Sequence, residues 1–263
     1  MAKAILYDAT KCTACRACQV ACKQWNELPA EVTINRGTYE NPPDLSPHTW
    51  IKIKFIELEK EGKLDWLFAR QACMHCTDAA CVEVCPTGAL SYHELGFVQY
   101  EKDKCCGCGY CAEFCPFGVP KLESGKITGV GVMDKCVFCI DRVTNGLEPA
   151  CVKTCPTGAL TFGDRDDLAA EGRARVEALK ADGFSNAYLY GDEELGGLHV
   201  LYVLADRPSV YGLPEEPEFP ALASVRDNIF RPFAWITWGV VAVGLALNVV
   251  VARARQLRGK EES

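Results

Sequence analysis

Four cysteine motifs constrain this chain more than any other feature of its 263 residues. Sixteen of the 17 cysteines belong to these motifs, which we number I to IV. They are Cys12-x2-Cys15-x2-Cys18-x3-Cys22, Cys73-x2-Cys76-x4-Cys81-x3-Cys85, Cys105-x2-Cys108-x2-Cys111-x3-Cys115 and Cys136-x2-Cys139-x11-Cys151-x3-Cys155. Proline directly follows the last three, at Pro86, Pro116 and Pro156. Cys-x2-Cys-x2-Cys-x3-Cys-Pro is the bacterial ferredoxin spacing, so four quartets predict four [4Fe–4S] clusters and a chain that passes single electrons over a distance.

The spacing within each motif also predicts crossed ligation. Two-residue gaps allow three cysteines of one tight loop to bind a single cluster. The fourth cysteine lies three residues further on, at the start of a helical turn, and ligates the cluster of a partner motif. The proline after it removes a backbone donor and redirects the chain. We therefore expect the motifs to work in pairs.

Two other uses of cysteine fit this pattern less well. Zinc sites usually consist of two Cys-x2-Cys pairs separated by a longer loop, without the x2-x2-x3 run and proline. Disulfide scaffolds are mostly short secreted domains. The spare cysteine is Cys106, because only Cys105 keeps the spacing, and we expect Cys106 to be a small buried packing residue. Motif I departs from the pattern, since Lys23 follows Cys22 in place of proline, but its spacing is kept.

Length and charge narrow the class of protein. A chain of this length forms one or two domains, and metal ligation ties together loops that have little apolar core of their own. The net charge of −7 argues against nucleic-acid binding, as does the lack of a basic stripe in the sequence. Six basic residues beside the motifs either offset the negative charge of the clusters or are ordinary solvated side chains: Lys11, Arg16, Lys23, Lys104, Lys135 and Lys153.

An internal repeat and several periodic segments predict an α+β architecture. The sequence CPTGAL occurs at 85–90 and again at 155–160, which indicates two copies of one ferredoxin unit. In each copy, proline and glycine should end a helical turn, and the apolar residues should start a strand. We expect strands at 50–58, 97–100 and 127–133. The residues 166–181 predict a helix that Gly183 terminates.

The C-terminal region predicts a membrane anchor. Residues 207–220 contain four prolines and should form an extended linker over a surface. Residues 233–251 contain no charge and are long enough to cross a bilayer as a helix. The basic residues that follow favour a cytoplasmic C-terminus, which would put the cluster domain outside the membrane. The N-terminus has no apolar signal segment, so we expect export of the folded, loaded chain together with a partner that carries a signal.

Local sequence around the motifs resembles one family. The stretches 8–26 (DATKCTACRACQVACKQWN), 73–78 (CMHCTD), 107–111 (GCGYC) and 197–204 (GLHVLYVL) closely resemble the iron–sulfur (beta) subunit of membrane-bound respiratory formate dehydrogenases. The resemblance covers nearly the whole chain. Many partners of molybdenum enzymes share the four-motif spacing, but motif I with its KQW continuation and the single terminal helix point to formate dehydrogenase.

The resemblance implies partners and a place in the cell. Such beta subunits lie between a catalytic alpha subunit, with molybdenum or tungsten bis-pterin, and a membrane cytochrome b (gamma) subunit that reduces quinone. The terminal helix would pack on the gamma subunit. The cluster domain would lie outside the bacterial cytoplasmic membrane and be exported by the twin-arginine route, with the signal on the alpha subunit.

Spacing and resemblance together give the expected ligand sets and domains. Set A is Cys12, Cys15, Cys18 and Cys155; set B is Cys22, Cys136, Cys139 and Cys151; set C is Cys73, Cys76, Cys81 and Cys115; set D is Cys85, Cys105, Cys108 and Cys111. We expect two interleaved bacterial-ferredoxin-like units that each hold two clusters, plus one transmembrane helix. Their ranges are 1–70 with 125–204 (motifs I and IV), 71–124 (motifs II and III), a linker at 205–228, the helix at 229–252 and a basic cytoplasmic tail at 253–263.

We expect no catalytic site in this chain. It has no glycine-rich phosphate loop, no His-Glu-x-x-His motif and no nucleophile arrangement. His75 lies inside motif II, and we expect it to pack or to donate a hydrogen bond near the cluster, without binding iron. Two alternatives remain. One is the same role for a hydrogenase or for a sulfur- or sulfoxide-reducing molybdoenzyme. The other is a membrane-anchored adaptor that binds zinc.

Overall fold

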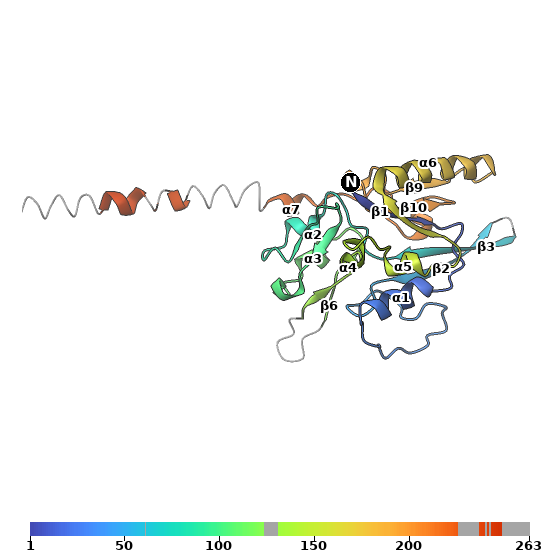
Figure 1. The fold of residues 1–263 in the computed structure, drawn as a ribbon, viewed down its shortest axis with the longest axis horizontal. Coiled ribbons are helices and arrows are strands. Elements are labelled where there is room, and N and C mark those ends of the chain that lie inside the picture. Colours follow the sequence, from blue (N-terminus) through green and yellow to red (C-terminus); the bar gives the residue numbers. More distant parts are fainter. Residues whose placement is uncertain (61, 124–130, 226–236, 240, 242, 249–263) are drawn as a thin grey trace, which may run out of the picture. The chain divides into compact units, whose positions relative to one another are not determined.

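The computed structural model describes residues 1–60, 62–123, 131–225, 237–239, 241 and 243–248. The chain forms two compact units, Met1–Phe219 and Pro220–Ser263. All 17 cysteines lie in the first unit, whose elements are labelled in Figure 1.

A four-stranded sheet organises the first unit. Its strands are β1 (Lys3–Asp8), β8 (Leu160–Asp164), β9 (Tyr188–Tyr190) and β10 (Val200–Leu204), in the order β8-β1-β10-β9. β1 runs parallel to β10, with Ile5 opposite Val200, and antiparallel to β8. β9 pairs antiparallel with β10. The sheet therefore joins the N-terminal strand to strands that lie more than 150 residues later in the chain.

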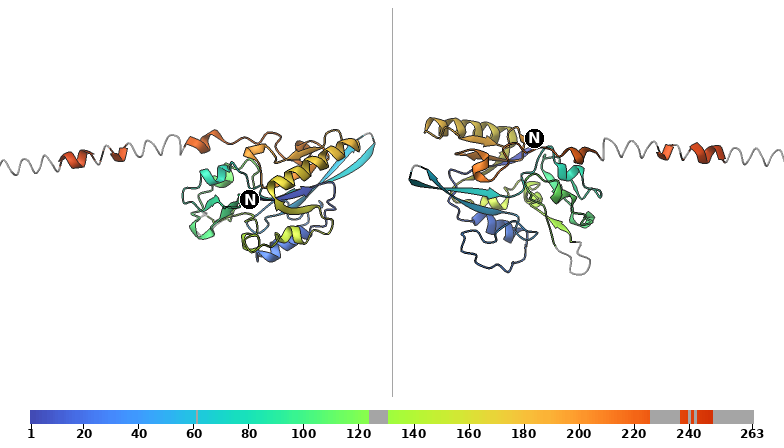
Figure 2. Two further views of the ribbon diagram at one scale, coloured as in Figure 1. Left: turned by 45° about the horizontal axis from the view of Figure 1, so that its top comes forward. Right: turned by 180° about the vertical axis from the view of Figure 1, so that it is seen from behind.

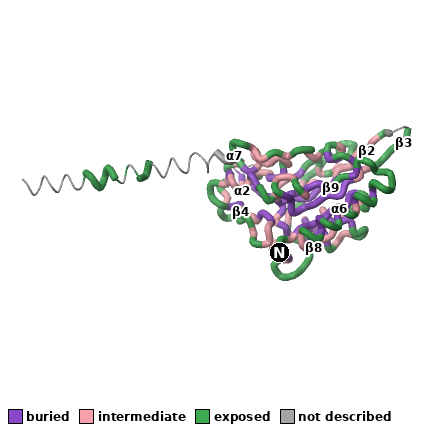
Figure 3. The backbone as a smooth tube through the Cα atoms, turned by 90° about the horizontal axis from the view of Figure 1, so that it is seen from above, coloured by how far each residue is buried: buried purple, intermediate pink, exposed green. Residues whose placement is uncertain are grey.

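The two faces of this sheet have different partners. Helix α6 (Arg165–Ala181) covers one face (Figure 1), where Leu6 and Val203 pack with Leu168 and Val176. Alternate residues of the same strands point the other way and pack in a core that contains cysteines of motifs I, II and IV; they include Ile5, Tyr7, Val200 and Tyr202. This alternation follows from the two-residue period of a strand. The two central strands are the most deeply buried, since every residue of β10 and all but the first of β1 are buried, and Figure 3 shows buried backbone at the neighbouring β9.

Three hairpins complete the strands of the first unit. The longest pairs β2 (Lys52–Lys60) with β3 (Lys63–Gln71) and projects from the unit, as both views in Figure 2 show. The other two are short. They pair β4 (Leu90–Tyr92) with β5 (Val98–Tyr100), and β6 (Lys121–Leu122) with β7 (Met133–Asp134).

Short helices lie at the cysteine motifs. Helix α1 (Ala17–Trp25) packs on α5 (Ala150–Lys153), and α2 (Ala80–Glu83) packs on α3 (Tyr110–Glu113). These contacts bring motif I to motif IV and motif II to motif III. The remaining described helices are α4 (Ile140–Val143), α7 (Ala221–Val225) and the 3-10 turns η1 (Lys102–Lys104), η2 (Glu194–Gly196) and η3 (Pro208–Tyr211).

The repeated CPTGAL sequence folds in the same way twice. Gly88 and Gly158 have φ angles of 66° and 63°, a region that glycine adopts without steric cost. Leucine then starts a strand in both copies, β4 at Leu90 and β8 at Leu160. The turn and strand expected from the repeat are therefore present at both sites.

Other expectations can be compared with the described residues. The strand expected at 50–58 is β2, and the helix expected at 166–181 is α6, after which Gly183 has a φ of 98°. Of the stretch 127–133, residues 127–130 lie outside the described part. The segment 207–220 is not extended throughout, because it contains η3 and its Tyr211 is buried. Apolar packing of that tyrosine fixes the start of the predicted linker on the first unit.

The expected membrane helix at 229–252 and the basic tail at 253–263 lie mostly or wholly outside the described residues. In the second unit the structure describes α7 and parts of the stretch 237–248. Among the residues that the structure describes, no helix is both long and apolar enough to span a membrane.

Candidate metal centres

Motif I places its cysteines on a strained loop and the helix that follows it. Ala14 and Arg16 have φ angles of 53° and 62°, which fold the loop sharply between Cys12 and Cys18. The Ala14 N–H donates to the Cys12 Sγ at 3.4 Å. Helix α1 carries both Cys18 and Cys22. These two residues are four apart, so they lie on one face of the helix, which is the face that packs on α5.

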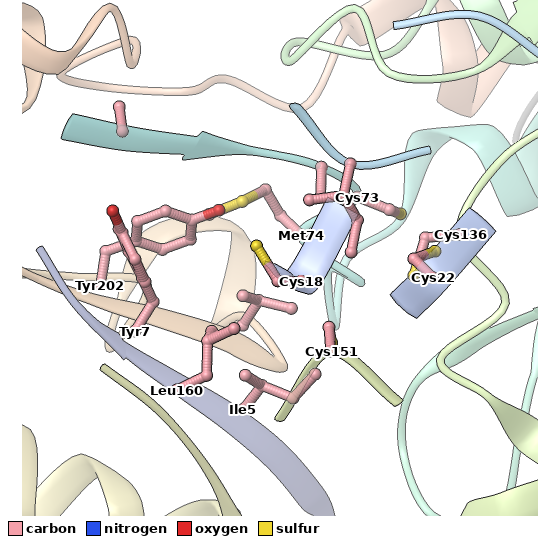
Figure 4. Close-up of a cluster of buried hydrophobic side chains, with 14 of the residues drawn as sticks. Ile5, Tyr7, Cys18, Cys22, Cys73, Met74, Cys136, Cys151, Leu160 and Tyr202 are labelled. Carbon is pink, nitrogen blue, oxygen red and sulfur yellow. The ribbon is translucent and has the colours of Figure 1, made fainter. Parts of the chain in front are cut away.

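Set B is the best-defined group of sulfurs. Burial raises the pKa of Cys22, and the neighbouring thiols of Cys136, Cys151 and Cys139 raise it further. Figure 4 shows Cys22 and Cys136 next to each other, although 114 positions separate them. The four expected members of set B are thus mutual neighbours, and all four are buried.

Set A is brought together in part. Burial raises the pKa of Cys18 to about 12, against the lowering effect of Arg70, with further raising by Cys151, Cys12 and Cys15. Cys18 therefore neighbours two members of its own set and one member of set B. Cys155 lies just after α5, half-buried against the same core.

Sets C and D form in the same way around α2 and α3. Burial raises the pKa of Cys76, and Cys73, Cys115 and Cys81 raise it further. For set D, burial raises the pKa of Cys111 to about 12, with contributions from Cys108, Cys105 and Cys85. In sets B, C and D, one cysteine thus has its pKa raised by the other three expected members of its set.

Electrostatic effects between cysteines of different sets indicate an order. Cys18 of set A neighbours Cys151 of set B. Cys73 of set C raises the pKa of Cys136 of set B, after burial. Burial is also the main cause of the raised pKa of Cys81 of set C. Cys111 of set D raises this pKa further, and Lys135 lowers it. The four sets therefore succeed one another as A, B, C and D.

Exposure differs along this series. The four cysteines of set B are buried, and none of those in set C is exposed. Each end of the series has one exposed cysteine, Cys15 in set A and Cys108 in set D. The inner sets are thus shielded from water, while the outer sets reach the surface.

The surroundings of Cys85 suit an anionic metal-bound thiolate. Burial raises the pKa of Cys85, but N–H groups of Leu90, Thr87 and Ala89 and the Thr87 hydroxyl hold it below its usual value. Such donors favour a charged sulfur. A cavity separates the sulfurs of set D, and its lining includes Cys85, Cys105, Cys108 and Cys111. Among the described residues, which include every cysteine, no disulfide links two of them, and no three His, Cys, Asp or Glu side chains converge on one ion position.

Two predictions about single residues have different outcomes. His75 is buried, its Nδ1 lies 3.1 Å from the Val98 carbonyl, and its ring packs edge-on against Phe138, as expected of a packing residue. The prediction for Cys106 was wrong. Cys106 is exposed and lines the set D cavity. It lies at the surface, directly before a turn at Gly107, whose φ is 70°.

Two buried cations lie among the sulfurs. Lys135, already noted beside motif IV, is 1% exposed and donates to the carbonyls of Val98 and Cys136 at 3.2 and 3.0 Å. Arg70 is 2% exposed, and the cysteine spacing did not predict its role. Its position three residues before motif II was the available signal, but nothing in the strand pattern distinguishes an inward arginine from a solvated one.

Comparison with known proteins gives consistent matches. Residues 64–165 and residues 11–89 each match a 4Fe-4S dicluster domain family, and the two ranges together contain all sixteen motif cysteines. The chain is 44% identical over 235 residues to the Formate dehydrogenase-O iron-sulfur subunit of Escherichia coli (strain K12), which covers 87% of this chain and 76% of that protein.

Two further relatives are similar over at least three quarters of this chain. The Formate dehydrogenase 2 subunit beta (cytochrome c-553) of Nitratidesulfovibrio vulgaris is 38% identical over 222 residues, covering 80% of this chain and 97% of that protein. The Hydrogenase-2 operon protein HybA of Escherichia coli O157:H7 is 34% identical over 227 residues, covering 75% of this chain and 68% of that protein.

Proposed function

Because this chain belongs to the family of formate dehydrogenase iron–sulfur subunits, we propose that it receives electrons from a molybdenum or tungsten bis-pterin subunit and delivers them to a membrane cytochrome b and quinone. The chain is an electron-transfer subunit with four [4Fe–4S] clusters and is non-catalytic within its complex. When bound, each cluster accepts and releases one electron at a time.

We propose that sets A to D are the ligands of the four clusters. The mutual influence of the thiols within sets B, C and D supports this assignment, as does the packing of α1 on α5 and of α2 on α3. The same contacts support the interleaved units of 1–70 with 125–204 and of 71–124. Cys155 is assigned to set A by its motif spacing and by its place after α5.

One observation carries the relay function above the others: the series of sets is buried in its middle and open at both ends. The cysteines of set B are all buried and those of set C are buried or half-buried, which limits the access of water to the middle of the series. Cys15 and Cys108 bring the outer sets to the surface, where partner proteins can approach. An arrangement with two accessible ends and a shielded middle suits transfer between two partners.

We further propose that residues 229–252 cross the membrane once and that residues 253–263 lie in the cytoplasm, with the cluster unit on the outer side. The uncharged run at 233–251 and the arginines after it support this topology. A chain ending at Phe219 should leave the membrane fraction and keep its iron. If this truncated chain stays with the membrane in the absence of its partners, the anchor lies elsewhere.

A related relay for a hydrogenase is the second candidate, because HybA is similar over three quarters of this chain. Formate dehydrogenase is favoured by the higher identity of its iron–sulfur subunits, 44% against 34%. The native complex, purified anaerobically through this chain, distinguishes them. Formate should bleach the iron–sulfur absorbance and reduce haem b. A response to hydrogen but not to formate would keep the relay and change the donor, and a colourless zinc protein would refute both.

Single cysteine-to-serine variants test the ligand sets. C22S and C151S should each remove the same cluster signal in electron paramagnetic resonance, because both belong to set B. C18S should remove a different one, although Cys18 and Cys22 share helix α1. The spare cysteine supplies the matched control, since C106S should leave every signal intact. Loss of one shared signal from both C18S and C22S would contradict crossed ligation.

A further inference from the structure

Arg70 is a buried cation with no hydrogen-bonding partner for its charge. It lies in β3, and its guanidinium nitrogens Nε, Nη1 and Nη2 are all buried. In the part of the chain that the structure describes, none of the three has a hydrogen-bond partner, so no carboxylate oxygen accepts from them. The Tyr202 hydroxyl is close, but it donates to the Arg70 carbonyl at 2.8 Å.

The groups that surround the guanidinium are thiols of two different sets. Burial lowers the pKa of Arg70, but Tyr202, Cys151, Cys136 and Cys18 raise it by more, so its net pKa lies above the ordinary value. Burial also raises the pKa of Tyr202, against the lowering effect of the Arg70 guanidinium beside it. The cysteine sulfurs near Arg70 carry negative charge once a cluster binds them as thiolates. Cys18 belongs to set A, whereas Cys136 and Cys151 belong to set B.

Energetics make this arrangement unusual for a purely structural arginine. A buried charge without partners is strongly unfavourable, and an arginine with five N–H donors normally finds carbonyls or carboxylates. Lys135 illustrates the usual solution, since it donates to two carbonyls. Arg70 instead has cysteines of two sets among the groups that shift its pKa and no hydrogen-bond partner for its guanidinium among the described residues.

On the basis of the ligand sets proposed above, we propose that Arg70 is a potential-tuning residue: its fixed charge and its unpartnered N–H groups would raise the reduction potentials of clusters A and B, the clusters that sets A and B would bind. Hydrogen bonds to sulfur and local charge are two of the levers that set the potential of such clusters. Reduction adds one negative charge, which a nearby cation stabilises. The unit formed by motifs I and IV thus holds an electron more firmly than it would without Arg70.

The electron balance of this step is simple. A cluster held by set A or set B would gain one electron, and the reduced centre that donates it would lose one electron. The guanidinium offsets the added negative charge. No proton is taken up, because arginine keeps its charge throughout the physiological range of pH.

Three variants of the complete complex test the proposal. R70Q removes the charge and keeps hydrogen-bonding ability, and R70K keeps the charge on a different geometry. K54Q is the matched control. It removes a positive charge from the other strand of the same hairpin, where the Lys54 Nζ lies near Gly212. Iron content is measured first. Redox titration monitored by electron paramagnetic resonance then gives the potential of each cluster.

We expect R70Q to keep its iron and to lower the potentials of clusters A and B. At a fixed applied potential the ratio of reduced to oxidised cluster should fall about tenfold, which is about 59 mV for a one-electron couple. Clusters C and D should be unaffected. R70K should shift A and B less than R70Q, and K54Q should shift none.

Each other outcome has a defined meaning. A fully loaded R70Q with unchanged potentials overturns the proposal. Loss of iron in both R70Q and R70K also overturns it, because Arg70 would then be required for folding alone. Loss of iron in R70Q but full loading in R70K supports the need for a cation. A wild-type complex without cubane signals refutes the proposed function itself, independently of Arg70.

Discussion

Gly96 should be one of the least replaceable residues in the first unit. Its φ is +94°, and a Cβ added there would lie 2.2 Å from the His199 Cε1 and 2.8 Å from its Nε2. The His199 ring cannot easily move, since it is buried and its Nδ1 lies 2.7 Å from the Lys3 carbonyl. The backbone strain of G96A costs about 1–2 kcal/mol, and the overpacking adds about 1–3 kcal/mol. We therefore expect about 3 kcal/mol of local destabilisation.

Native-state hydrogen exchange of the loaded protein measures this effect directly. The informative amides are Ile5, which donates to the His199 carbonyl, and His199, which donates to the His75 carbonyl. A local cost of about 3 kcal/mol lowers their protection about a hundredfold. The loss should extend to set C, because Leu198 forms a bridge with Cys76.

A matched glycine separates strain from collision. Gly37 has a φ of +78° with no atom within 4 Å of an added Cβ, so G37A carries only the backbone cost. In the double variant G96A/H199A the collision is removed, and the second substitution should cost less than it does alone. Equal protection in G96A and G37A would refute the steric reasoning.

Three further expectations concern pH, a link between motifs, and the clusters. Burial keeps the pKa of His199 below its usual value, so the folded state holds the imidazole neutral. The stability of the fold should therefore be full above about pH 7 and fall below about pH 6.5, where the unfolded state binds a proton. Thermal unfolding of H199Q should show a smaller decline at low pH. Trp25 donates a hydrogen bond to Asp141 at 2.9 Å, and the Arg142 guanidinium lies 4.2 Å from the centroid of the Trp25 ring. W25A should therefore increase the rate of cluster loss from set B by a few-fold, measured as bleaching of the iron–sulfur absorbance. An unchanged rate would contradict this expectation. Iron chelation should remove the hydrogen-exchange protection of the amides in α2 and α3. The amides of α6 and of the sheet should stay protected, because the packing of α6 on the sheet contains no cysteine. A uniform loss of protection would show that the clusters stabilise the whole unit.

The sequence by itself determined the chemistry of this protein. Cluster ligation imposes strict local spacing on cysteines, so the four motifs alone predict the number and type of clusters. Local rules also predicted helix α6 and the turns at Gly88 and Gly158, because apolar periodicity and a positive φ depend on neighbouring residues alone. The crossed ligand sets followed from the same spacing together with the family resemblance.

Only the tertiary structure decided which groups from distant segments surround the sulfurs. Arg70 lies in a hairpin outside all four motifs, and the fold places it close enough to Cys18 and Cys151 for these cysteines to raise its pKa. The tertiary structure likewise determines that Cys106 is exposed, that Tyr211 is buried and that His199 lies against Gly96. Each depends on contacts between residues that are far apart in the chain or on the direction of a surface loop. Residue spacing carries no direct record of such contacts, since long-range packing selects one arrangement among many that the local pattern allows.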